Sequence, residues 1–95
     1  MIVRKYNIAG RVQGVGFRYF VCQAARQLKL QGTVRNLADG SVECIAAAPP
    51  DRETALAQLE QRLRQGPPHS RVDHVYIEEL AGAFARELPA AFEII

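Results

Sequence analysis

The sequence predicts an α+β fold, in which an antiparallel β-sheet carries two helices on one face and a short strand closes the chain. Several stretches alternate apolar and polar residues with a period of two, as strands do. Two other stretches repeat apolar residues at steps of three and four, which is typical of amphipathic helices. Glycine or proline lies between consecutive stretches. The predicted order is therefore strand, helix, hairpin, helix, strand and short terminal strand.

The first strand is predicted from Val3 to Ala9. Tyr6 and Ile8 lie on one face of this stretch and Lys5 and Asn7 on the other, so one face is expected to be sheltered from water. The strand leads directly into a glycine-rich segment.

The first helix is predicted from Phe17 to Leu30. We expect Gly32 to end it, because a glycine commonly follows the last helical turn. Its apolar residues recur at helical spacing and form one stripe: Phe17, Val21, Ala24, Ala25 and Leu28.

A β-hairpin is predicted next. The stretches Thr33–Leu37 and Ser41–Ala47 are rich in strand-forming residues, and Asp39-Gly40 between them is a strong turn signal. The alternation in the second stretch places three residues on one face: Val42, Cys44 and Ala46.

The second helix is expected to begin at Asp51, whose side chain is suited to cap it, and to end at 66–68, Gly-Pro-Pro. Its apolar stripe consists of leucines 56, 59 and 63.

The chain then returns to strand between Val72 and Leu80, turns with weak helical character over 81–91, and ends in a short strand over 92–95. The complete order is that of the split βαβ, or ferredoxin-like, βαββαβ sandwich. This architecture serves many functions and by itself identifies none.

Length and composition predict one domain over residues 1–95. A chain of this size buries roughly 60 to 65% of its unfolded surface. Apolar residues make up 48% and charged residues 23%, as in ordinary globular proteins. The net charge is only +2 and the basic residues are scattered, so we expect no nucleic-acid partner. A monomer is the default expectation.

The first residues contain no continuous apolar stretch of the length that a secretory signal or a membrane span needs. We therefore expect a cytoplasmic protein without a membrane partner. Cys22 and Cys44 have neither the number nor the spacing of a disulfide framework or a metal site. We expect them to be free thiols that pack in the interior.

Residues 8–18, Ile-Ala-Gly-Arg-Val-Gln-Gly-Val-Gly-Phe-Arg, are the main candidate for a functional site. Gly10, Gly14 and Gly16 can take positive φ, so that successive N–H groups turn around an anion at the start of a helix. Arg18 adds a planar cation suited to phosphate oxygens. The spacing matches neither a Walker loop nor a dinucleotide fingerprint. The residues alone leave open a simple turn with a solvated Arg18.

Residues 10–18 resemble, position by position, the first signature of the acylphosphatase family, whose members hydrolyse the carboxyl-phosphate bond. The resemblance implies that Arg18 and the loop amides hold the substrate phosphate. The implied phosphate-binding residues are Gln13, Gly14, Val15, Gly16, Phe17 and Arg18.

Residues 32–42 resemble the second signature of the same family. The resemblance implies that Asn36 positions the attacking water. On residues alone, an asparagine before a hairpin more often bonds the turn, here Asp39-Gly40. Thr33 stands where the family usually has an aromatic residue and Ala48 where it usually has glycine, which affects local packing more than chemistry.

The resemblance implies an acylphosphatase that converts an acyl phosphate and water to a carboxylate and inorganic phosphate, without metal or cofactor. Arg18 and Asn36 are the expected catalytic residues. Because Asn36 is neutral, it can orient a water but cannot act as a general base, so the proton is expected to pass to the phosphate of the substrate.

Two other functions remain open at this point. The first is a non-catalytic module that binds phosphate or carbamoyl phosphate, related to the domain at the start of hydrogenase-maturation carbamoyltransferases; the freestanding length disfavours it. The second is an RNA-binding domain of similar topology, which needs exposed aromatic residues on its central strands. The predicted hairpin over 33–47 contains none.

Overall fold

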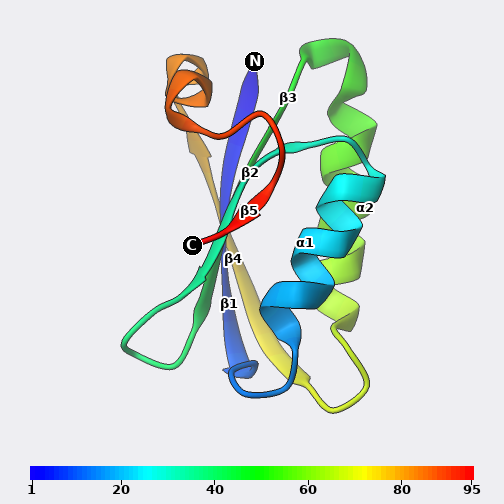
Figure 1. The fold of residues 1–95 in the computed structure, drawn as a ribbon, viewed down its shortest axis with the longest axis vertical. Helices are drawn as coiled ribbons and strands as arrows, with labels where there is room; N and C mark the ends of the chain where they lie inside the picture. Colours follow the sequence, from blue (N-terminus) through cyan, green and yellow to red (C-terminus); the bar gives the residue numbers. More distant parts are fainter.

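The computed structural model describes residues 1–95 and has the predicted βαββαβ order. Figure 1 shows two helices packed on one face of a five-stranded sheet. The sheet order is β4-β1-β3-β2-β5, with the first four strands antiparallel and β5 parallel to β2. The strands are β1 (Ile2–Arg11), β2 (Gln31–Asn36), β3 (Val42–Ala48), β4 (Arg71–Leu80) and β5 (Glu93–Ile94); the helices are α1 (Phe17–Gln27) and α2 (Glu53–Gln65), with short 3-10 helices η1 (Pro50–Arg52) and η2 (Gly82–Glu87). The ferredoxin-like prediction is confirmed, with a parallel terminal strand added to an otherwise antiparallel sheet.

The main core lies between the sheet and the two helices. Tyr6 of β1 lies opposite Cys44 of β3 and Ile77 of β4, and Cys44 lies opposite Val34 of β2, so these residues share the face that the helices cover. The predicted stripes of both helices are buried there, except that Leu28 is only partly buried. Buried apolar surface contributes about 25 cal/mol per Å² to folding.

A smaller core lies on the opposite face of the sheet, beneath η2, which Figure 1 shows on the side away from α1 and α2. Val3 of β1, Ala47 of β3 and Ala85 of η2 form this core. The weakly helical character predicted for residues 81–91 is confirmed by η2. Val3 is fully buried although it shares a face with Lys5 and Asn7, because η2 covers that end of the strand.

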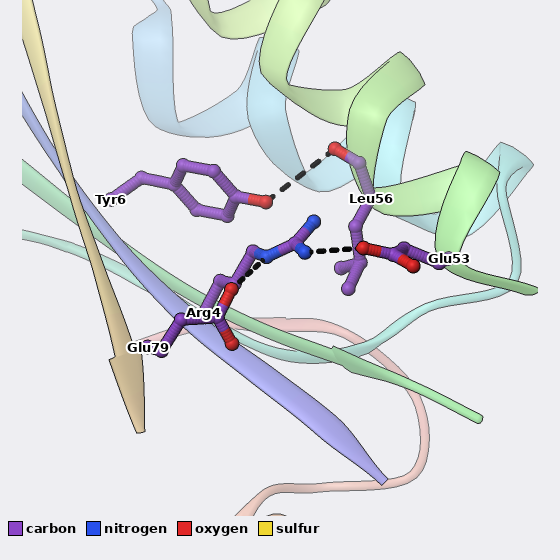
Figure 2. Close-up of polar contacts among 5 residues, drawn as sticks. All are labelled: Arg4, Tyr6, Glu53, Leu56 and Glu79. Carbon is purple, nitrogen blue, oxygen red and sulfur yellow. Dashed lines mark hydrogen bonds and ion pairs between the residues drawn. The ribbon is translucent and has the colours of Figure 1, made fainter. Parts of the chain in front are cut away.

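A polar cluster joins the sheet to α2 (Figure 2). The guanidinium of Arg4 on β1 pairs with Glu79 on β4 and with Glu53 at the start of α2. The hydroxyl of Tyr6 donates to the carbonyl of Leu56 at 3.4 Å. Only 17% of the Arg4 side chain is exposed, so its aliphatic stem is covered while its charge is paired. The two glutamates, with Glu79 contributing most, raise the pKa of Arg4.

The predicted end of the first helix is wrong. The helix ends at Gln27, Lys29 takes the left-handed conformation with φ 56°, and Gly32 lies inside β2. A Cβ at Gly32 would lie 1.9 Å from the carbonyl oxygen of Ile45 and 2.9 Å from the Phe92 ring. This glycine therefore makes room for packing between β2, β3 and the buried Phe92.

The predicted cap of the second helix is also wrong. Asp51 lies in η1, and α2 begins at Glu53 with Arg52 as its N-cap and no side-chain capping bond. Pro50 favours a tight turn at this point, and Asp51, the residue expected to cap α2, forms part of that turn. The guanidinium of Arg52 instead donates to the carbonyls of Leu28 and Lys29 at the end of α1.

Both cysteines are free and buried, as predicted. Cys44 is fully buried in the main core, and burial raises the pKa of its thiol. Neither helix is both long enough and apolar enough to cross a lipid bilayer.

Candidate active site

The glycine loop (residues 12–16) connects β1 to α1. Gly14 and Gly16 have φ of 74° and 80°, a conformation that side chains disfavour, and both positions have open space where a Cβ would lie. Gly16 is the N-cap of α1, and no side chain caps the helix. The first N–H groups of α1, at the positive end of the helix dipole, are therefore open to an anion.

Gly10 has a different purpose from the loop glycines. It lies at a bulge between β1 and β4, where a Cβ would approach the carbonyl oxygen of Arg71 to 2.1 Å. The close approach of the two backbones fixes the direction in which β1 enters the glycine loop.

Arg18 is the second residue of α1 and is exposed. Its side chain makes no hydrogen bond or ion pair, whereas Arg4, Arg35, Arg64 and Arg71 each pair with a carboxylate. The guanidinium of Arg18 is therefore free to bind an external anion, and its place in the first turn of α1 directs it to the same region as the open N–H groups.

Asn36 is the last residue of β2 and lies opposite Val42 of β3. Because Val34, two residues earlier, is buried under the helices, Asn36 shares that face of the sheet. The side-chain Oδ1 atom of Asn36 is buried and has no hydrogen-bond partner. An unsatisfied buried acceptor costs roughly 1 to 3 kcal/mol, so this atom is prepared for a donor from outside the chain.

The turn after Asn36 is stabilised without its side chain. The amide and hydroxyl of Ser41 donate to the carboxylate of Asp39 at 2.9 and 2.6 Å. These bonds, that from the hydroxyl first, lower the pKa of Asp39. The alternative role of Asn36 as a partner of the Asp39-Gly40 turn is thus not seen, because Ser41 fills it.

One cavity of about 230 Å³ joins these features. Arg18 and Asn36 both line it, together with Gly14, Gly16 and Phe17 of the predicted phosphate site. Gln13 and Val15 are not among the residues that line it; Val15 packs against the main core. The cavity also has lining residues that the sequence did not indicate as functional: Val12, Tyr19 and Ile94.

Gln13 instead connects the glycine loop to the hairpin. Its side-chain amide donates to the carbonyl oxygens of Leu37 at 2.8 Å and of Ser41 at 2.9 Å. Asn7 of β1 donates to the Ser41 hydroxyl at 3.1 Å. The loop that begins α1 and the turn that follows Asn36 are thereby held in one arrangement.

The fold and this arrangement make the chain a small ferredoxin-like α/β sandwich with a candidate anion site at a helix N-terminus. The family model described as acylphosphatase matches residues 4–94. The chain belongs to the acylphosphatase family.

Individual relatives agree with this assignment. The acylphosphatase of Koribacter versatilis is 53% identical over 78 residues, which cover 82% of this chain and 68% of that protein. The acylphosphatase of Rhizorhabdus wittichii is 45% identical over 85 residues, covering 90% of this chain and 83% of that protein. The crystal structure of acylphosphatase from Bacillus subtilis matches with a TM-score of 0.84 at 37% identity and covers 100% of this chain and 99% of that chain.

Proposed function

We propose that this protein hydrolyses acyl phosphates to a carboxylate and inorganic phosphate. Membership of the acylphosphatase family supports the reaction class. The observation that carries the proposal is the shared cavity, which is lined both by Arg18, whose side chain makes no ion pair, and by Asn36, whose Oδ1 is buried without a hydrogen-bond partner. The guanidinium of Arg18 can donate to a phosphate oxygen, and Oδ1 of Asn36 can accept a hydrogen bond from a water.

In this proposal the substrate phosphate binds at the N-terminus of α1. The N–H groups of residues 13–18 surround its oxygens, with positive φ at Gly14 and Gly16 allowing the loop to curve. Arg18 donates charge-assisted hydrogen bonds, which are about twice as strong as neutral ones. The same contacts stabilise the charge that spreads over the phosphoryl oxygens in the transition state.

Asn36 aims the attacking water. Its Oδ1 accepts a hydrogen bond from one O–H of the water, which directs a lone pair of the water oxygen to phosphorus. A new bond forms between the water oxygen and phosphorus, while the bond from phosphorus to the acyl oxygen breaks and its electron pair leaves with the carboxylate. The second proton of the water passes to a phosphate oxygen, because Asn36 is neutral throughout. No step in this scheme uses a metal ion or cofactor.

Positioning is the main source of rate in this scheme. Correct placement of reactants can lower a barrier by roughly 7 to 11 kcal/mol, and one preorganised hydrogen-bonding group contributes about 3 to 4 kcal/mol. A carboxylate is a good leaving group, so no strong protein acid is required.

We also propose that residues 1–95 act as one domain and as a monomer, with the acyl phosphate and inorganic phosphate as the only partners.

The test is hydrolysis of benzoyl phosphate, followed by ultraviolet absorbance with chelator present throughout. We expect turnover by the wild type and a loss of at least about a hundredfold in kcat for Asn36→Ala. Binding of inorganic phosphate and the melting temperature should be largely retained in this variant, since Oδ1 of Asn36 makes no hydrogen bond within the chain. A folded wild type that binds phosphate without hydrolysing the substrate would instead favour the phosphate-binding module.

A further inference from the structure

We propose that Tyr19 and Ile94 form a subsite for the acyl group, so that the preferred substrates are acyl phosphates with an apolar aromatic or alkyl acyl group. This inference rests on the proposed function, because it assigns the other half of the same substrate. The loop amides, Arg18 and Asn36 account for the phosphate and the water only.

The apolar side chains of the cavity divide into two kinds. Val12 and Phe17 are each 1% exposed and belong to the main core. Tyr19 and Ile94 are 65% and 43% exposed, although both are large and apolar. Among the lining residues, these two are therefore the apolar side chains that a ligand can cover.

Both residues lie on regular elements of the fold, which fix the positions of their backbones. Tyr19 lies in the first turn of α1, next to Arg18, and its hydroxyl accepts a hydrogen bond from the side chain of Gln23 one turn later. Ile94 lies in β5 opposite Val34 of β2, and the N–H of Ile95 donates to the Val34 carbonyl at 2.9 Å. The backbone positions of the subsite are thus fixed before a ligand binds, which lowers part of the entropy cost of binding.

The segment before Ile94 is also anchored to α1. Phe92 is fully buried, and its carbonyl accepts a hydrogen bond from Nε of Arg26 at 2.9 Å. The thiol of Cys22 points to the same carbonyl at 3.5 Å. Because α1 carries Tyr19 and also anchors the residues before Ile94, the two sides of the subsite keep a fixed separation.

The charge of the cavity favours an uncharged acyl group. Arg18 is the only lining side chain that carries a charge at neutral pH, and the proposed function uses it for phosphate. A carboxylate on the acyl group would lie against Tyr19 and Ile94, where the lining offers no second cation to pair with it. The cavity of about 230 Å³ also lies below the range of roughly 300 to 1,000 Å³ typical for drug-sized ligands, so the acyl group is small.

The first experiment measures binding, so that it does not depend on turnover. Calorimetry compares benzylphosphonate with methylphosphonate, two stable phosphate analogues that differ in their apolar group. We expect the wild type to bind benzylphosphonate roughly three- to tenfold more tightly, and Tyr19→Ala or Ile94→Ala to remove that preference. Affinity for methylphosphonate should change less than about twofold in either variant, because the phosphate contacts remain.

The second experiment compares benzoyl phosphate with acetyl phosphate as substrates. Tyr19→Ala and Ile94→Ala should raise KM for benzoyl phosphate roughly three- to tenfold and should raise KM for acetyl phosphate by a clearly smaller factor. Tyr76→Ala is the matched control: Tyr76 is 57% exposed but lies on β4, at the opposite edge of the sheet from β5. It should change neither KM.

The outcomes separate the two proposals. The acyl subsite would be overturned if the wild type bound the two phosphonates equally well. It would also be overturned if the variants weakened binding of both phosphonates equally. Both results hold whether or not the protein is an enzyme. Absence of hydrolysis with either acyl phosphate, together with a phosphonate preference that Tyr19→Ala removes, would overturn the proposed reaction and leave the subsite intact. Ile94→Lys provides a positive test, because it should improve binding of a phosphonate that carries a carboxylate relative to benzylphosphonate.

Discussion

The side-chain nitrogen of Gln13 lies 2.8 Å from the carbonyl oxygen of Leu37, the residue directly after Asn36. A second bond from the same nitrogen reaches the carbonyl of Ser41 at 2.9 Å. The glycine loop and the end of β2 come from separate parts of the chain, and these bonds join them. Gln13 therefore links the loop that is proposed to bind phosphate to the residue that follows Asn36.

The first prediction concerns this connection. In Gln13→Glu the ionised side chain cannot donate to the two carbonyls and is repelled by them, so kcat should fall about tenfold. Affinity for inorganic phosphate should change less, because the loop N–H groups and Arg18 are retained. Nearby carbonyls disfavour the carboxylate, so the side chain becomes a donor when protonated, and part of kcat should return as the pH falls from about 8 to about 5. The measurement is kcat across that range.

Gln13→Met is the control for this variant, since it removes the donor and introduces no titrating group. Its kcat should be lower than that of the wild type by the same factor at every pH. Recovery of Gln13→Met at low pH, or wild-type kcat in both variants, would show that the bonds to Leu37 and Ser41 have no role in placing Asn36.

The second prediction concerns the unpaired arginine. Arg18→Ala should weaken binding of inorganic phosphate by about ten- to a hundredfold, because a hydrogen bond to a charged group contributes roughly 1.5 to 3 kcal/mol. Arg18→Lys should restore only part of the affinity, since an ammonium keeps the charge but not the planar fork. Arg11 is the matched control, being exposed and unpaired near the same loop. Calorimetry should find Arg11→Ala within about twofold of the wild type; similar losses in both variants would indicate a general electrostatic effect.

The regular elements could be predicted because their signals are local. Tyr6 and Ile8 alternate with polar residues, and Leu56, Leu59 and Leu63 repeat at helical spacing, so each pattern marks a buried face without knowledge of the partner element. Asp51 and Gly32 gave wrong boundaries because tertiary contacts override local preference there. Gly32 is required by the approach of β3 and Phe92, which no local pattern shows.

The same distinction applies to the site. The positive φ of Gly14 and Gly16 follows from residue type and spacing, and the structure confirms it. The position of Ile94 at the cavity that Tyr19 also lines depends on parallel pairing between β5 and β2, which joins residues 34 and 94. A two-residue strand carries too little alternation to reveal its partner. The side chain of Gln13 likewise finds its acceptors only when the hairpin folds against the loop.

The third prediction concerns Gly32. Gly32→Ala should lower the free energy of unfolding by about 3 kcal/mol, because it combines a φ of 148° with a Cβ placed 1.9 Å from the Ile45 carbonyl oxygen. Gly40→Ala is the matched control, since Gly40 has a φ of 94° but open space around its Cβ position. It should cost only about 1 to 2 kcal/mol. Urea unfolding measures both; equal losses would mean that backbone conformation alone explains the glycine at position 32.

The fourth prediction concerns stability at alkaline pH. Tyr6 is fully buried, and burial raises the pKa of its hydroxyl to about 12, compared with about 10 in an unfolded chain. Between these two values the folded protein holds a proton that the unfolded chain has lost, so stability is complete below about pH 10 and falls as the pH rises toward 12. Tyr6 should account for a loss of about 2 kcal/mol across this range.

Tyr6→Phe should remove that part of the pH dependence. At neutral pH the variant loses only a long hydrogen bond to the Leu56 carbonyl, which costs about 1 kcal/mol or less. The buried thiol of Cys44, whose pKa is also raised, lowers the stability of both proteins at high pH. Because Cys44 lies opposite Tyr6, the comparison measures Tyr6 together with its interaction with that thiol. Tyr76→Phe, at an exposed position, should retain the wild-type slope. Urea unfolding at about pH 8, 10 and 11.5 gives the slope of the unfolding free energy against pH for the wild type and both variants. A slope for Tyr6→Phe equal to that of the wild type would show that Tyr6 ionises as easily in the folded chain as in the unfolded one.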